Sequence, residues 1–193
     1  MSPDEKRDRL LEAASVLLEH AKEHRLNAVC LNKALFYLDL VSMRDTGLPV
    51  TFAPFVAIHN GPVVAKYDSK LIGELEKAGI AEQEEDGKAK PIRLKSPVSH
   101  RRFVHESLVP AIKRISEEFS GNVSNKASEM SHKNLGWQMA YNAGLKAKSQ
   151  ALSINMQIAM QQIIDSDPWL TTTLSDEEEA ALNAPDCSSG DCW

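Results

Sequence analysis

Apolar residues recur every three or four positions along most of this chain, which is the period of an amphipathic helix. The first such repeat follows Ser2-Pro3-Asp4-Glu5, where a serine can cap a helix, proline suits its first position and glutamate completes a capping box. Its apolar members are Leu10, Ala14, Leu17 and Ala21. The pattern predicts a first helix that extends to about His24.

A second helix is predicted from Asn27 to Asp45. Asn27 is a favoured N-cap residue, and Gly47 can adopt the left-handed conformation that ends a helix. The apolar residues between them are Leu31, Ala34, Leu35, Leu38 and Val41. Pro49 and Pro54 prevent the helix from continuing, so the next stretch is expected to be an ordered crossing loop.

That loop contains a short apolar patch and then a turn signal, Asn60-Gly61-Pro62. The patch consists of Phe52, Phe55, Val56 and Ile58. Since Pro is common at the first position of a helix, the turn is expected to start a third helix, from Val64 to Ala78, which Gly79 ends.

The period changes after Gly79. Two short runs, residues 80–83 and 91–95, flank Asp86-Gly87 and predict a small β-hairpin. A helix followed by a β-ribbon also occurs in winged-helix DNA-binding proteins, so this alternative stays open. The predicted helix nevertheless carries balanced charges, with Asp68, Glu74 and Glu76 against Lys66, Lys70 and Lys77, which does not favour contact with phosphates.

Further helical repeats follow the hairpin. They predict a helix over 104–119 with a kink or break at Pro110, a short helix from Ser124 towards Trp137, and an apolar helix over 152–164. The fold class is therefore mainly α, a compact multi-helix domain with one small β-hairpin and a C-terminal helical extension. We expect the domain to span 1–145, the extension 146–184, with a capping box at Ser175, and a disordered tail 185–193.

Composition agrees with a folded domain. Of the 193 residues 42% are hydrophobic, and the net charge of −5 gives the whole chain no attraction to nucleic acid or to an anionic membrane. The charged N-terminus and the lack of a long apolar run predict a cytoplasmic protein. The cysteines Cys30, Cys187 and Cys192 are then expected to be reduced thiols.

Candidate chemistry is sparse. His20 and His24 have the spacing of a metal pair but no surrounding acidic motif, so we expect no metal site. His132 near Trp137 is interpreted as a hydrogen-bonded structural pair, because no nucleophile is placed by sequence to use the imidazole. The chain shows no phosphate-binding loop, dinucleotide fingerprint or nucleophile elbow. We therefore expect no enzyme activity and no cofactor.

The stretch from Lys33 to Val63 resembles the Panacea antitoxin domain, the family that includes the SocA-type proteins and the prophage-associated GepA proteins. The resemblance rests on a helix motif, a Thr-Gly-x-Pro motif and a Gly-Pro-Val step, aligned without a gap. The matching residues are Lys33, Leu35, Phe36, Asp39, Thr46, Gly47, Pro49, Val50, Thr51, Phe55, Ala57, Gly61, Pro62 and Val63. A looser match continues to Ser131, His132 and Trp137.

The resemblance implies an antitoxin that neutralises a cognate toxin by direct protein binding. Two alternatives stay open: a proteolytic adaptor that delivers a toxin to a protease complex, and a winged-helix regulator. The constrained turn at Asn60 favours a partner-binding surface there, because a rigid turn loses little entropy on binding. The residues expected to border it are Asp39, Arg44, His59, Asn60, Val63, Lys66 and Tyr67, with the helix 152–164 as the next candidate surface.

Overall fold

A computed structural model of the chain describes residues 1–85, 90–121, 124–149 and 151–165. Its helices are α1 (Pro3–His20), α2 (Ala28–Thr46), α3 (Gly73–Lys77), α4 (Val109–Gly121), α5 (Ser124–His132), α6 (Leu135–Ala147) and α7 (Met156–Asp165). Its strands are β1 (Arg25–Asn27), β2 (Phe55–Ile58), β3 (Gly61–Val64), β4 (Ala81–Gln83), β5 (Pro91–Leu94) and β6 (Leu152–Ser153). Helix predominates in these ranges, which confirms the mainly α fold class.

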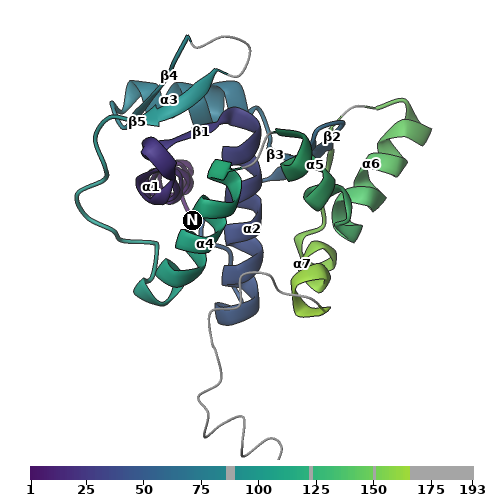
Figure 1. Cartoon of the computed structure of the whole chain (residues 1–193). Coiled ribbons are helices and arrows are strands. Elements are labelled where there is room, and N and C mark those ends of the chain that lie inside the picture. Colours follow the sequence, from purple (N-terminus) through teal and green to yellow (C-terminus); the bar gives the residue numbers. More distant parts are fainter. Residues whose placement is uncertain (86–89, 122–123, 150, 166–193) are drawn as a thin grey trace, which may run out of the picture.

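Helix α2 stands at the centre of the molecule, with α1 and α4 on one side and α5 and α7 on the other (Figure 1). Every residue from Cys30 to Ser42 is buried, so the helix has no solvent face. Its predicted ends are confirmed: the Asn27 side chain accepts a hydrogen bond from the Cys30 N–H over 2.7 Å, and Gly47 is left-handed with φ 79°.

Four polar side chains on this buried helix all bond to the segment that follows it. Ser42 donates to Leu48 O (2.8 Å), Asp39 accepts from Thr51 N (2.9 Å) and Thr51 Oγ1 (2.5 Å), Asn32 accepts from Val64 N (2.8 Å), and Lys33 donates to Asn60 O (2.5 Å). Burial raises the pKa of Asp39 to about 7, against the lowering effect of the Thr51 hydrogen bonds. The helix therefore sets the path of residues 48–64.

Residues 55–64 form a β-hairpin, so the prediction that the turn at Asn60 starts a helix is wrong. Phe55 pairs with Val64 and Ile58 pairs with Gly61, which makes His59-Asn60 the hairpin turn. Strand β6 pairs with the other side of β2. Because β3 is an edge strand in the order β3-β2-β6, it tolerates the proline at position 62 that lacks an N–H.

The hairpin predicted after Gly79 is confirmed as β4 and β5, although its expected tip, Asp86-Gly87, lies outside the described residues. Strand β1 adds to β5 and completes a sheet in the order β1-β5-β4. The described residues thus hold two three-stranded sheets, so the prediction of one small hairpin is confirmed only in part. Three-residue strands such as β1 are too short to produce a recognisable alternating pattern.

Three predicted helix boundaries also need correction. Strand β3 continues to Val64, and the chain then turns at Lys66 (φ 59°) into a single π-helical turn, Asp68–Ile72, that leads into α3. The π-helical turn runs directly into α3, so the two together form ten helical residues, Asp68–Lys77. The helix predicted over 104–119 begins only at Val109, after a 3₁₀ turn at Glu106–Leu108, and Pro110 lies in its first turn, where a missing N–H costs nothing. The first helix ends at His20, before a 3₁₀ turn.

The described part of the C-terminal extension packs into the same core as the domain. Helix α7 contacts both α2 and α6, and its Ala159 lies so close to Gly136 that a Cβ there would be 2.8 Å away. Residues 152–153 form a strand rather than the start of the predicted helix. The capping box at Ser175 and the tail 185–193 lie outside the described residues. Among the helices described, none has the length and apolarity to cross a membrane.

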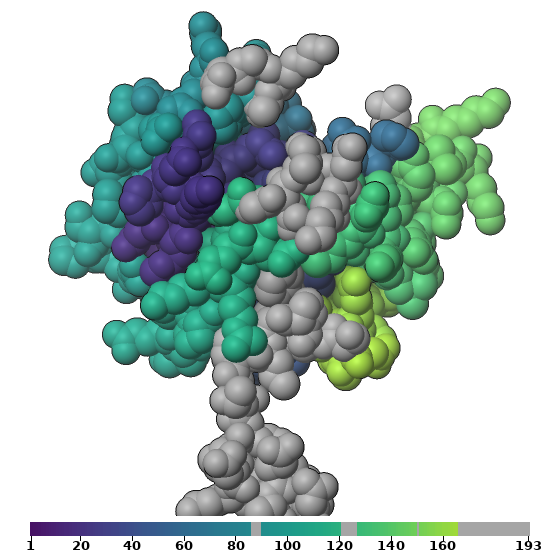
Figure 2. Space-filling view, viewed as in Figure 1, coloured from purple at the N-terminus to yellow at the C-terminus, as the bar shows by residue number. Residues whose placement is uncertain are grey.

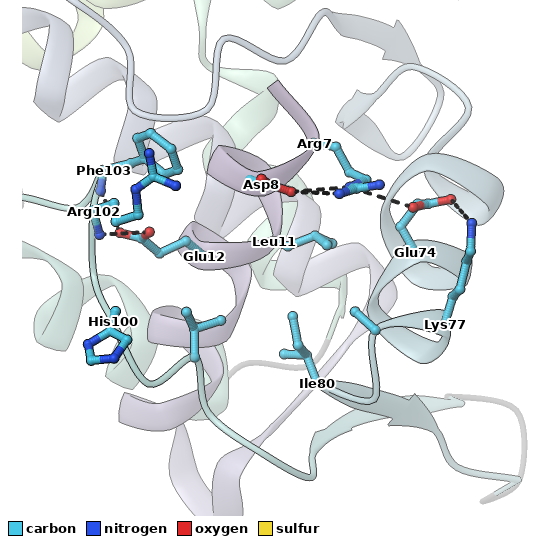
Figure 3. A pocket seen from close by; sticks show the side chains of 12 residues that line it. Arg7, Asp8, Leu11, Glu12, Glu74, Lys77, Ile80, His100, Arg102 and Phe103 are labelled. Atoms are coloured by element: carbon cyan, nitrogen blue, oxygen red, sulfur yellow. Dashed lines mark hydrogen bonds and ion pairs between the residues drawn. The ribbon is translucent and has the colours of Figure 1, made fainter. Parts of the chain in front are cut away.

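A buried carboxylate fastens the connection before α4 to α1. Glu12 is only 3% exposed, and its carboxylate accepts hydrogen bonds from three consecutive backbone N–H groups, those of Arg102 (2.9 Å), Phe103 (2.7 Å) and Val104 (2.8 Å). Figure 3 shows Glu12 reaching the backbone of Arg102 and Phe103. A single side chain thus satisfies three donors in one loop.

We expect Glu12→Gln to lower the free energy of unfolding by about 2 kcal/mol, because an amide NH₂ would face N–H donors that lose their acceptor. Urea denaturation measures this change. Glu19→Gln on the same helix is the matched control, since the exposed ion pair of Glu19 with Arg101 is worth at most about 1 kcal/mol. Equal losses in the two variants would contradict this account of Glu12.

Candidate recognition cleft

The exposed turn of the β2–β3 hairpin, His59-Asn60, is held from beneath by two helices. The backbone carbonyl of Asn60 accepts a hydrogen bond from Lys33 Nζ of α2 over 2.5 Å and one from Ser128 Oγ of α5 over 3.1 Å. Ser131 of α5 lies beside the same turn. The turn therefore cannot move without breaking contacts to the core.

Lys33 is a fully buried lysine, and none of the described carboxylates pairs with it. Burial lowers the pKa of its ammonium group from 10.5 to about 8. The group remains largely protonated at neutral pH and donates to a backbone carbonyl. Its function in the fold is to position the hairpin turn.

Gly61 is required at the turn for two reasons. Its φ of 109° lies in a region that residues with a side chain rarely adopt. In addition, a Cβ at this position would lie 2.6 Å from Ser131 Oγ and 3.0 Å from the end of the Lys33 side chain. The close approach of the hairpin backbone to α2 and α5 depends on this glycine.

Three aromatic rings form a stack beside the hairpin. His132 lies 4.2 Å from Trp137 between ring centroids, and Trp137 lies 4.8 Å from Tyr141, with interplanar angles of 13° and 11°. Trp137 Nε1 donates to the Ile58 carbonyl over 3.2 Å, and the Tyr141 hydroxyl lies 3.2 Å from His59 Nδ1. The stack joins α5 and α6 to the turn.

His132 lies at the inner end of this stack. Burial lowers its pKa, a hydrogen bond with the His59 backbone raises it, and the nearby charge of Lys33 lowers it. Its Nε2 atom is buried without a hydrogen-bond partner in the structure. These surroundings favour the neutral imidazole, which can stack flat on Trp137.

A cleft of about 470 Å³ opens between the hairpin turn and the C-terminal half of α6. Its lining residues are Ala57, Ile58, His59, Asn60, Tyr141, Gly144, Leu145, Ser149 and Ala151. The walls are mostly apolar, and His59 and Asn60 supply polar groups at the rim. Leu145 is 62% exposed, and α6 projects from the body of the molecule, as the space-filling view shows (Figure 2).

The apolar walls of the cleft are suited to binding an apolar group. In the ranges that the structure describes, no three His, Cys, Asp or Glu side chains gather as metal ligands. An apolar pocket with a few polar groups at its rim is typical of sites that receive a small ligand or one large side chain of a partner.

A family model for the Panacea domain of SocA-like antitoxins matches residues 31–138, which is 108 of the 193 residues. The chain belongs to this family. Comparisons with curated proteins and with solved structures found no match. The family match confirms the resemblance of residues 33–63 to the Panacea domain.

The matched Panacea region contains α2, the hairpin, α5 and Trp137, but it ends before Tyr141 and Leu145. One wall of the cleft therefore belongs to the Panacea domain, and the other is supplied by residues that follow it. The rigid support of the turn lies wholly inside the domain, because Lys33 and Ser128 do.

The structure does not bring the seven predicted contact residues of the Panacea domain together. His59 and Asn60 are exposed at the hairpin turn, whereas Lys66 and Tyr67 follow β3 at its opposite end. Arg44 lies near the end of α2, 2.6 Å from the carboxylate of Asp45. The two remaining residues, Asp39 and Val63, are 1% and 4% exposed and offer no surface to a partner.

Tyr141 and Leu145 are the cleft residues that the sequence interpretation missed. They follow Trp137 at intervals of four, a pattern typical of one helix face, but nothing local indicates that this face meets the hairpin turn. His132 and Trp137 lie together as interpreted, but they stack on each other instead of sharing a hydrogen bond, since Trp137 Nε1 donates to Ile58 O. Lys33 was recognised only as part of a family motif.

We expect Gly61→Ala to destabilise the fold by at least about 3 kcal/mol, because it combines a forbidden backbone conformation with a side-chain overlap. Gly79→Ala is the matched control: Gly79 is also left-handed, with φ 67°, but has open space around it, so about 1 kcal/mol is expected. Chemical denaturation of both variants provides the comparison. Similar losses would show that the overlap with Ser131 is unimportant.

The lowered pKa of Lys33 predicts that the free energy of unfolding rises at alkaline pH. Between pH 8 and 10.5 the folded protein holds fewer protons on Lys33 than the unfolded chain, so the free energy of unfolding increases with pH, by up to about 3 kcal/mol. Lys33→Met should abolish this increase, whereas Lys70→Met, at an exposed position, should retain it. Urea titrations at several pH values measure the difference between variant and wild type, and parallel pH profiles would contradict the prediction.

Proposed function

We propose that the chain is the antitoxin of a toxin–antitoxin pair and that it neutralises its toxin by binding it directly at the cleft beside the hairpin turn. The observation that carries the proposal is membership of the SocA-like Panacea family across residues 31–138. The geometry of the cleft supports the choice of surface.

The cleft has the features of a protein-binding hot spot. The turn is already held by Lys33 and Ser128, so binding costs little conformational entropy. Leu145 offers an apolar wall, and the Tyr141 ring is fixed between Trp137 and His59. A partner side chain that enters the cleft would displace water from apolar walls and bond to the polar rim.

The proposed mechanism is stoichiometric binding without turnover. The test is a titration of this protein against the purified product of the neighbouring reading frame. We expect the toxic activity of that product to be abolished at a molar ratio near one to one. Neutralisation at far lower ratios would point to catalysis. A requirement for an added protease would favour the adaptor alternative.

Leu145 provides a direct test of the surface. We expect Leu145→Asp to weaken binding to the product of the neighbouring frame at least tenfold, about 1.4 kcal/mol, because a carboxylate would be buried in an apolar wall. Calorimetric titration measures the affinity, and growth on co-expression reports neutralisation. Leu48→Asp is the matched control, since Leu48 is 60% exposed but lies outside the cleft.

Both variants should keep the melting temperature of the wild type, because both leucine side chains are exposed. If Leu145→Asp binds as tightly as the wild type, the contact surface is not this cleft. The antitoxin role would still be tested separately, by the titration described above.

A further inference from the structure

A second surface, a groove along the N-terminal half of α1, carries features that toxin binding at the cleft does not use. It lies on the α1 side of the molecule, across α2 from α6 (Figure 1). The groove consists of two cavities, of about 540 and 410 Å³, which share Arg7, Glu74 and Lys77 as lining residues. Figure 3 shows the smaller cavity, between α1, α3 and the connection that leads to α4.

The larger cavity has an apolar floor, and its lining contains five basic residues against two acidic ones, Asp4 and Glu74. Lys6, Lys66 and Lys70 are exposed at its rim, and these three lysines form no ion pair within the described part of the chain. The floor is made by Leu10, Phe52, Ala53, Pro54 and Val64. Unpaired lysines above an apolar floor complement a segment that carries both carboxylates and an apolar residue.

Glu74 lies at the boundary between the two cavities, and its ion pairs there are weak. Glu74 lies 4.0 Å from Arg7 Nε and 4.0 Å from Lys77 Nζ, and both basic side chains are substantially exposed. Ion pairs of this length and exposure contribute little to stability. An incoming carboxylate can therefore pair with Lys77 at small cost, whereas Arg7 is also bound to Asp8 over 2.9 Å.

Two residues of the larger cavity hold left-handed backbone conformations, Phe52 with φ 52° and Lys66 with φ 59°. Phe52 is fixed by the guanidinium of Arg9, which lies 5.2 Å from its ring centroid and 4.4 Å from that of Phe103. Such conformations persist only where the surrounding structure maintains them, and they concentrate at binding sites. The shape of this cavity is thus preformed.

The acidic residues that would complement the groove are concentrated at the end of this chain. Residues 166–193 contain seven of the 27 acidic residues and no Lys, Arg or His. The preceding 165 residues therefore carry 22 basic residues against 20 acidic ones, which is a net positive charge. The densest acidic run is Asp176–Glu179, followed by Ala180, Ala181 and Leu182.

We propose that the acidic run Asp176–Leu182 of the same chain docks in this groove. Its carboxylates face Lys6, Lys66 and Lys70, and Leu182 lies on the apolar floor. The docked run covers a preformed positive surface and competes there with any other acidic segment. The proposal does not depend on the toxin-binding role of the cleft.

The chain is long enough to make this contact. Ten residues separate Asp165, the end of α7, from Asp176, and they span up to about 36–40 Å when extended. Helix α7 packs on α2, and α2 packs on α1, so the path crosses about two helix diameters of 10–12 Å each. The tether also gives the docked run a high effective concentration at the groove.

The native cysteines allow a test on the full chain. Cys187 and Cys192 follow the acidic run, whereas Cys30 is fully buried, so a nitroxide label attaches to the C-terminal segment alone. In the labelled protein we expect paramagnetic loss of NMR amide signals around Lys66 and Lys70 but not around Leu145. Raising the ionic strength from about 0.05 M to about 0.5 M should restore the signals, since screening weakens the charge contacts.

Lys66→Glu with Lys70→Glu should abolish the signal loss. The matched control is Lys133→Glu with Lys146→Glu, which reverses two exposed lysines outside the groove and should leave the loss unchanged. Mixing spin-labelled chains with unlabelled ¹⁵N chains separates contact within a chain from contact between copies. The proposal is overturned by an absence of signal loss, by loss that appears only in the mixed sample, or by loss that persists in Lys66→Glu/Lys70→Glu.

Discussion

The burial of α2 on every face is the constraint on which the rest of the structure depends. A helix without a solvent face can carry polar side chains only if each finds a partner inside the protein, since an unpaired buried polar group costs several kcal/mol. Asn32, Lys33, Asp39 and Ser42 all find theirs in residues 48–64. The requirement for partners therefore fixes the course of this segment, and with it the hairpin turn.

The recognition cleft follows from that arrangement. Lys33 and Ser128 hold the turn from inside the Panacea domain, and Tyr141 and Leu145 of α6 meet it from outside the matched region. The rigid support of the turn and the apolar wall opposite it are thus supplied by different parts of the chain. A change at Leu145 alters the wall without disturbing the core, because its side chain is exposed, whereas a change at Gly61 alters both.

The C-terminal residues and the rest of the chain carry opposite net charges. The overall charge of −5 indicates an acidic protein, yet all of that excess lies in residues 166–193. The body of the protein, with unpaired lysines around the α1 groove, is weakly basic. The body and residues 166–193 therefore act as two separate electrostatic surfaces. Screening limits the range of the charges on each part to about 10 Å at moderate salt.

The sequence by itself determined the features that depend on neighbouring residues. The N-caps at Ser2 and Asn27, the left-handed Gly47, the β4–β5 hairpin and the predominance of helix were all predictable, because caps and turns act over three or four positions. The family motif also placed residues 33–63 correctly within the Panacea domain.

Only the tertiary structure decided that residues 55–64 form a hairpin, that Asp39 is buried and that Tyr141 meets His59. Strand β2 acquires its second partner from Leu152 and Ser153, almost a hundred residues later, and Asp39 and Thr51 are joined across the turn after α2. Local propensity at Gly61-Pro62 suits a helix start as well as an edge strand. Two hydrogen bonds favour the strand: Asn32 accepts one from Val64 N, and Lys33 donates one to Asn60 O, so both buried side chains have a partner in the hairpin.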